Sequence, residues 1–203
     1  MQCSIICAGD VPSLPEMSAD FVICADGGLA HAKRYGIKPD LIVGDFDSYG
    51  SVPPGENVFV HPVQKDETDS FLAAAYGIAR GYRTFVIYGA LGGRLDHSVA
   101  NLQLLHDLCL RGCRGTLVGA DGTRVTAIQN ETLTFPASQT GQLAVFSLTA
   151  ESHGVTIKNM QYEADNVTLT NHTSLGASNA FCGRAGSVTV RDGILLVIWK
   201  EDL

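Results

Sequence analysis

Two aspartates one position apart follow an apolar run in LIVGDFDS, residues 41–48. In an extended chain the side chains of residues i and i+2 share a face, so the carboxylates of Asp45 and Asp47 would converge and repel each other. A divalent cation removes this repulsion, and Mg²⁺ binds carboxylate oxygens together with the oxygens of a substrate phosphate. The pair therefore favours a metal–phosphate site over a chance arrangement of two like charges.

Three other aspartates stand where they could join this pair. Asp26 precedes two glycines, Asp69 comes just before a helical stretch in KDETDS, and Asp96 stands in GGRLDH. Taken singly, Asp69 and Asp96 are better explained as residues that stabilise a helix N-terminus, and Asp26 equally well as a turn residue. Their joint recurrence, however, favours a metal–phosphate site.

The segment around GGRLDH also carries groups suited to phosphate. Gly92 and Gly93 allow the backbone to approach a ligand closely, Arg94 offers a forked donor, and the helix that follows begins with free N–H groups. Lys65 could supply a second cation. The sequence has neither GxxxxGK[ST] nor GxGxxG, so a nucleotide would be held by metal and scattered contacts. The residues alone thus indicate Mg²⁺-dependent chemistry on a phosphorylated ligand.

The elements that must position these residues alternate in the first half of the chain. Apolar runs that end in glycine predict strands, and helical patterns separate most of them. Strands are expected over 3–9, 21–28, 40–48, 57–62, 84–93 and 115–121, and helices over 29–36, 70–82 and 97–112. This order predicts a doubly wound parallel sheet between helices, with the acidic residues on the rim formed by the strands' carboxyl ends.

The second half changes in texture after about Thr126. Short segments rich in Val, Ile and Thr are separated by Gly, Asn or Asp, with no helical pattern between them. Strands are expected over 132–138, 141–149, 154–160, 166–174, 186–193 and 194–200, and Asp192-Gly193 is a hairpin signal. We expect an α/β domain over 1–127 followed by a β-sandwich over 128–203, with a small barrel as the alternative for the second half.

Composition narrows the function classes. The chain has 203 residues, of which 45% are hydrophobic and 17% charged, which favours a folded core over disorder. A net charge of −7 argues against a nucleic-acid surface. No apolar run approaches the roughly 20 residues of a membrane span. The first residues lack the basic start of a signal peptide, so we expect a cytoplasmic protein without a membrane partner.

Cysteines and histidines form no ligand pattern. The cysteines contain no CxxC pair and several lie in apolar runs, which favours buried thiols over zinc ligands or disulfides. They are Cys3, Cys7, Cys24, Cys109, Cys113 and Cys182. His97 follows Asp96 and could orient it or contact phosphate, although a histidine at a helix start is as often structural.

Three segments together resemble the thiamine pyrophosphokinase (thiamine diphosphokinase) family. They are ADGGLAHAKRYGIKPDLIVGDFDS, KDETDS and YGALGGRLDHSVANLQLL, which span residues 25–105. SLGASNAF, residues 174–181, is similar to a segment of that family's second domain. The resemblance implies an α/β domain with a β-sandwich. It also implies a homodimer whose active site is shared across the interface, and Mg²⁺-dependent transfer of diphosphate from ATP to thiamine, leaving AMP.

The resemblance also implies roles for individual residues. Asp45, Asp47 and Asp69 would hold Mg²⁺ and the triphosphate, Asp96 would assist the metal site or the attacking hydroxyl, and Arg94 would neutralise charge. The residues expected around ATP are Asp26, Gly27, Gly28, Ser48, Lys65, Thr68, Gly93 and His97. Those expected at thiamine are Ser178 and Asn179.

One residue departs from the family pattern. Ala180 stands where the family usually has a glutamate after Ser-Asn, which bears on the acceptor and not on ATP. We favour ordinary variation within the family as the explanation of Ala180. Independently of this residue, two alternatives stay open: a diphosphokinase for another alcohol such as a hydroxymethylpterin, and a non-catalytic sensor of nucleotide or thiamine.

Overall fold

The computed structural model describes residues 1–11, 19–46, 52–55, 57–62 and 66–200, and it divides into two compact units. The first comprises Met1–Leu108 and Gly115–Ala120, and the second Cys109–Arg114 and Asp121–Leu203. The expected domain boundary between residues 127 and 128 falls inside a strand of the second unit, β7 (Thr123–Gln129). None of the described helices is both long and apolar enough to span a membrane.

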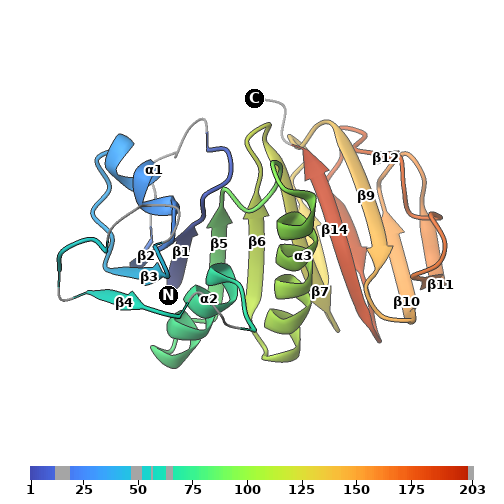
Figure 1. Ribbon diagram of the computed structural model, residues 1–203. Helices are drawn as coiled ribbons and strands as arrows, with labels where there is room; N and C mark the ends of the chain where they lie inside the picture. Colours follow the sequence, from blue (N-terminus) through green and yellow to red (C-terminus); the bar gives the residue numbers. More distant parts are fainter. Residues whose placement is uncertain (12–18, 47–51, 56, 63–65, 201–203) are drawn as a thin grey trace. The chain divides into compact units, whose positions relative to one another are not determined.

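The first unit is an α/β fold (Figure 1). Its strands are β1 (Gln2–Ile6), β2 (Phe21–Ala25), β3 (Leu41–Gly44), β4 (Val58–Val60), β5 (Thr84–Tyr88) and β6 (Arg114–Val118). Its helices are α1 (Gly28–Arg34), α2 (Asp69–Ala79) and α3 (Leu95–Leu110). Within this unit the strand order is β6-β5-β1-β2-β3-β4, and β1 pairs in parallel with both β2 and β5. The expected doubly wound sheet is confirmed.

Alternate residues of the strands meet different helices. Ile6 and Cys24 pack with Leu29 of α1 on one face of the sheet. On the other face Gly77 of α2 lies against Phe85 and Cys3, close enough that a Cβ there would be 2.5 Å from Phe85 Cε1. The strands are therefore buried on both sides, which is why their sequences are apolar throughout.

Helix α1 is closed by Gly36, the last residue of its expected range. Gly36 has φ +68°, its N–H donates to Lys33 O (3.2 Å), and the N–H of Ile37 donates to Ala32 O (2.8 Å). This is the Schellman arrangement, in which a left-handed glycine satisfies the last carbonyls of a helix.

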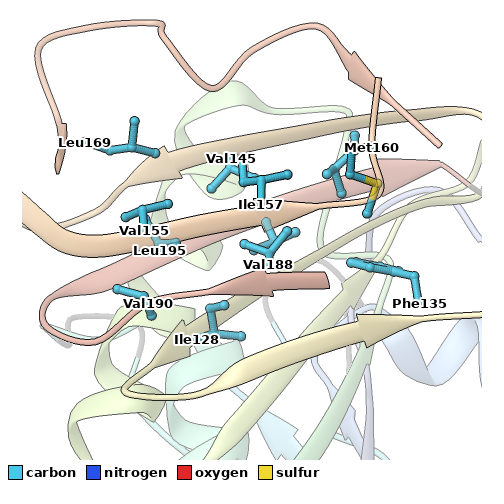
Figure 2. Packing of buried hydrophobic residues seen from close by; sticks show 12 residues of the cluster. Ile128, Phe135, Val145, Val155, Ile157, Met160, Leu169, Val188, Val190 and Leu195 are labelled. Atoms are coloured by element: carbon cyan, nitrogen blue, oxygen red, sulfur yellow. The ribbon is translucent and has the colours of Figure 1, made fainter. Parts of the chain in front are cut away.

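The second unit is a β-sandwich, as expected. Its strands are β7 (Thr123–Gln129), β8 (Thr132–Phe135), β9 (Gln142–Ser147), β10 (Glu151–Lys158), β11 (Ala164–Thr170), β12 (Asn179–Ala180), β13 (Gly186–Thr189) and β14 (Ile194–Lys200). Within this unit β12-β9-β14-β7 and β11-β10-β13-β8 form the two layers. Figure 2 shows the apolar side chains that fill the space between them, including Val145, Ile157, Val188 and Leu195.

The hairpin predicted at Asp192-Gly193 is wrong. The turn joins β13 to β14, but β13 pairs with β8 and β10 whereas β14 pairs with β7 and β9. Val188 of β13 and Leu195 of β14 both enter the sandwich core, so the chain must change layers here. The backbone before the turn pairs with His153 instead: Asp192 O accepts from His153 N at 2.8 Å.

Asp121 provides a pH-dependent contribution to the second unit. Its carboxylate accepts a hydrogen bond from Thr123 N at 3.1 Å and contacts Lys200 Nζ at 3.3 Å. Hydrogen bonds from Thr123, and then Lys200, lower the pKa of Asp121 to about 2. A depressed carboxyl pKa stabilises the fold above the unfolded value of about 3.9, and this contribution is lost as pH falls through the folded value.

We expect Asp121→Asn to lower the free energy of unfolding at pH 7 by less than about 1 kcal/mol, because the side chain is 60% exposed and solvent screens it. The difference between variant and wild type should shrink as pH falls from about 4 towards about 2. Urea unfolding at a series of pH values measures it, and a difference that stays constant would contradict the ionic origin.

Candidate active site

A cavity of about 580 Å³ opens in the first unit at the carboxyl ends of β1, β2 and β5. Its wall is formed by residues 7–10 after β1, by 25–26, by 67–70 at the start of α2 and by most of 89–94; His97 and Asn101 of α3 complete it. From β1 the sheet extends on one side through β2 and β3 to β4, and β5 pairs with β1 on its other side. Such a switch point is where open α/β sheets bind ligands.

Two of the expected aspartates lie in this wall. Asp26 follows β2 with φ +44°, and Asp69 is the first residue of α2. Both are half-buried. The expected gathering of strand-end and helix-start carboxylates is therefore found for this pair.

Of the two aspartates that led us to expect a metal site, Asp45 and Asp47, the structure describes only the first. Asp45 follows β3, is half-buried and is not part of the cavity wall; Asp47 lies outside the described residues. Phe46 between them has φ +59° and a side chain only 3% exposed, which packs among the apolar residues around α1. The chain thus leaves the extended conformation at Phe46, one position before Asp47.

Arg94 and Asp96 contact each other at the edge of the cavity. The guanidinium donates to both carboxylate oxygens, at 2.6 and 3.2 Å, and His97 N donates to the same carboxylate at 3.0 Å. The hydrogen bonds from Arg94 lower the pKa of Asp96 and raise that of Arg94. Both side chains are largely exposed, so the ion pair is weak. Arg94 can therefore leave Asp96 and bind an anion at low cost in free energy.

The other residues expected at ATP divide into three groups. Thr68, Gly93 and His97 line the cavity. Gly27 and Gly28 precede and begin α1 and do not line it. Ser48 and Lys65 lie outside the described residues.

The residues expected at thiamine belong to the second unit. Ser178 is exposed with φ +60°, and Asn179 is 5% exposed. The Asn179 amide is engaged with backbone: its Oδ1 accepts from the N–H groups of Tyr162 and Ala180 (both 2.9 Å), and its Nδ2 donates to Tyr162 O (2.7 Å). It therefore holds the backbone at Tyr162 next to the segment that carries Ser178.

The cavity wall also contains polar residues that were not expected, among them Cys7, Asp10, Glu67, Ser70 and Asn101. Burial, and then the charge of Asp69, raise the pKa of Cys7 to about 12, so this thiol stays protonated and is not a nucleophile at neutral pH. The position of Asp10 could have been predicted from the sequence, because it follows Gly9 at the end of an apolar run just as Asp26 follows β2.

The donor set of the cavity fits Mg²⁺ bound together with phosphate. In the described part of the chain, no three His, Cys, Asp or Glu side chains form a group that could hold a metal ion alone. Mg²⁺ bound to nucleotides uses only one or two carboxylates beside phosphate and water. The ionisable wall residues are Cys7, Asp10, Asp26, Glu67, Asp69, Arg94 and His97. A triphosphate would meet repulsion in so acidic a cavity unless a divalent cation accompanied it.

Comparisons with known proteins agree with this division into units. Residues 16–116 match the family model "Thiamin pyrophosphokinase, catalytic domain", and residues 130–195 match "Thiamin pyrophosphokinase, vitamin B1 binding domain". The thiamine pyrophosphokinase of Bacillus subtilis is 25% identical over 194 residues, covering 89% of this chain and 87% of that protein.

Solved structures show the same fold. The B. subtilis thiamine pyrophosphokinase superposes with a TM-score of 0.87 at 22% identity, with all of both chains covered. A thiamin pyrophosphokinase family protein from Enterococcus faecalis gives 0.86 at 25% identity, also over all of both chains. The thiamin pyrophosphokinase of Candida albicans gives 0.77 at 15% identity, covering 98% of this chain and 90% of that one.

The fold and the two matched segments define a kinase whose α/β unit matches the family's catalytic domain and whose β unit matches its vitamin B1 binding domain. The chain belongs to the thiamin pyrophosphokinase family, and it is an enzyme of the thiamine diphosphokinase class, which uses ATP as co-substrate. The family resemblance of its motifs is confirmed.

Proposed function

We propose that the protein transfers the terminal diphosphate of ATP to the hydroxyl of thiamine, with Mg²⁺ as the cofactor and AMP as the second product. The observation that carries this proposal is the acidic cavity at the switch point of the sheet, bordered by the N-terminus of α2 and by Arg94. Helix N-termini bind phosphate through their free N–H groups and dipole.

In the proposed reaction the thiamine hydroxyl oxygen attacks the β-phosphorus of ATP. The bond from that phosphorus to the oxygen bridging it to the α-phosphorus breaks, AMP leaves, and the hydroxyl proton passes to a carboxylate, for which Asp96 is the candidate. Such displacements depend on in-line positioning and charge neutralisation more than on a strong base. Arg94 would release Asp96 and bind phosphate as the substrates enter.

The metal would be held by Asp69 and, as the family resemblance implies, by Asp45 and Asp47, where it would neutralise charge on the triphosphate. Asp26, Thr68, Gly93 and His97 would contact ATP from the cavity wall. We also retain Gly27, Gly28, Ser48 and Lys65 as proposed ATP-site residues from the resemblance.

We propose a homodimer in which the active site is shared across the subunit interface, with Ser178 and Asn179 at the thiamine end. Asn179 would act there by fixing the backbone of Tyr162, because its amide is already bonded to that backbone. We place the enzyme in the cytoplasm, where buried thiols such as Cys7 and Cys24 would remain reduced. No nucleic-acid or membrane partner is proposed.

An AMP-release assay tests the reaction. Enzyme, Mg²⁺ and ATP are incubated with thiamine, with a hydroxymethylpterin, or with no acceptor, and AMP is quantified. The proposal expects AMP with thiamine only. AMP with the pterin alone would replace the acceptor, and ATP binding without AMP from either acceptor would make the protein a sensor.

Arg94→Ala is expected to raise the KM for ATP by about 10- to 100-fold, the usual loss for a charge-assisted hydrogen bond. The KM for thiamine should change by less than about twofold, since Arg94 lies at the phosphate end of the proposed site. Initial rates with each substrate varied at saturating levels of the other measure both constants.

The matched control is Arg83→Ala. Arg83 donates to Ile78 O in the last turn of α2 and to Tyr82 O after it, and it does not line the cavity. Its removal should leave both KM values near wild type. An increase confined to the KM for thiamine in Arg94→Ala would contradict the phosphate role.

A further inference from the structure

Asn101 is a buried polar residue in the cavity wall with no role in the reaction described above. It lies in α3, its side chain is 6% exposed, and both ends of its amide are hydrogen-bonded. The Oδ1 atom accepts from Ser70 Oγ at 2.7 Å, and Nδ2 donates to Ala90 O at 2.9 Å. The residue thus joins α3 to two other parts of the wall.

The first connection reaches the start of α2. Thr68 is the N-cap residue of this helix, but its side chain makes no capping hydrogen bond. Its Oγ1 lies 2.9 Å from Ser70 Oγ instead. Because the Ser70 hydroxyl gives its one proton to Asn101, Thr68 must donate to Ser70. Thr68 thus donates to Ser70, and Ser70 donates to Asn101. These hydrogen bonds fix the two residues on either side of Asp69.

The second connection reaches the loop between β5 and α3. Ala90 is 3% exposed, whereas Gly92 and Gly93 have φ of +84° and +62°, and a Cβ at either glycine would meet no atom within 4 Å. Glycines in open surroundings allow a loop many conformations. The hydrogen bond from Asn101 anchors this loop shortly before Arg94 and Asp96.

Asparagine suits this position because it offers an acceptor and a donor on one short side chain. An aspartate would keep the acceptor for Ser70 but would turn a second oxygen towards Ala90 O. A leucine of similar size would leave Ser70 and Ala90 with unsatisfied polar groups.

We propose that Asn101 is a positioning residue that holds the start of α2 and the loop before α3 in the relative arrangement needed to bind the triphosphate. The inference rests on the proposed function, in that it takes the cavity as the ATP site. Displacement of reacting groups by about 1 Å can cost about 100-fold in rate. Asn101 itself need not touch the substrate.

The test compares Asn101→Ala and Asn101→Asp with the control Asn57→Ala. Asn57 also donates its amide to backbone in the first unit, to Pro39 O and Asp40 O (both 3.2 Å), but it does not line the cavity. Both Asn101 variants should lower kcat/KM for ATP by about 10- to 100-fold and leave the KM for thiamine within about twofold. Asn57→Ala should lower the melting temperature and leave both kinetic constants near wild type.

Ser70→Ala removes only the hydrogen bond between Asn101 and α2, and it replaces the Asn101 variants in the test if these do not fold. It should lower kcat/KM for ATP by about 3- to 10-fold. Lower melting temperatures with unchanged constants for ATP would overturn the inference, as would wild-type kinetics in Asn101→Asp, which lacks the donor to Ala90. Direct titration with MgATP separates the two proposals. Wild type that binds MgATP but releases no AMP with thiamine would refute the reaction, while a weaker affinity of Asn101→Ala for MgATP would still support the positioning role.

Discussion

Asp69→Asn is expected to lower kcat for AMP formation by about 100- to 1,000-fold, with the fold preserved. The side chain lines the cavity at the first residue of α2, where phosphate would also lie. The substitution keeps the size of the side chain but removes a charge that would bind Mg²⁺ beside the triphosphate. Losses of this size follow the removal of one group that stabilises charge in a transition state. Steady-state rates at a series of Mg²⁺ concentrations measure the effect.

Asp66→Asn is the control for this prediction. Asp66 belongs to the same acidic segment, is exposed, and does not line the cavity. Its kcat should stay within about twofold of wild type, whereas Asp69→Asn should also require more Mg²⁺ for its remaining activity. Wild-type kcat in Asp69→Asn at saturating Mg²⁺ would refute the metal role.

The part of the site that could be predicted from the sequence is the part that follows from local patterns. Apolar runs ending in a charged residue place Asp26 at a strand end, and a helical pattern places Asp69 at a helix start. In a parallel sheet both positions meet at one rim, so their presence in one cavity could be inferred without coordinates. Gly36 is a similar case, because a left-handed residue closes a helix by local hydrogen bonds alone.

Other features depend on contacts between distant segments. Asn101 lies within a helical pattern, and its bonds to Ser70 and Ala90 arise only when two helices and a loop meet. The amide of Asn179 is likewise engaged by the backbone of Tyr162, 17 positions away. The turn at Asp192-Gly193 has the composition of a hairpin. However, Val188 before it and Leu195 after it are both buried in the core between the layers, and the two strands belong to different layers of the sandwich.

Gly28 is a further position whose role is set by packing. The motif places it beside Asp26, and the family resemblance assigns it to the nucleotide pocket. In the structure it is a buried residue at the first position of α1 and does not line the cavity. A Cβ there would lie 1.9 Å from Ile6 O and 2.6 Å from Ile6 C, so α1 can approach β1 only because residue 28 has no side chain.

Gly28→Ala is therefore expected to lower the free energy of unfolding by about 3 kcal/mol or more, the upper range for overpacking a closely packed site. The clash is with backbone atoms, which no side-chain rotation can relieve, so α1 would have to move away from the sheet. Urea unfolding monitored by far-UV circular dichroism gives the free energy, and low yield of folded protein would be an extreme form of the same result.

Gly36→Ala at the other end of α1 is the matched control. Its φ of +68° is unfavourable for alanine, but a Cβ would meet no atom within 4 Å, so only the backbone conformation is penalised, at about 1 kcal/mol. If close packing governs Gly28, the loss in Gly28→Ala should exceed that in Gly36→Ala by at least about 2 kcal/mol. Equal losses would mean that α1 moves off the sheet at little cost. A stable Gly28→Ala protein with a raised KM for ATP would instead contradict the packing role and leave Gly28 with only its proposed role at ATP. A residue that packs α1 against β1 should affect stability when it is changed.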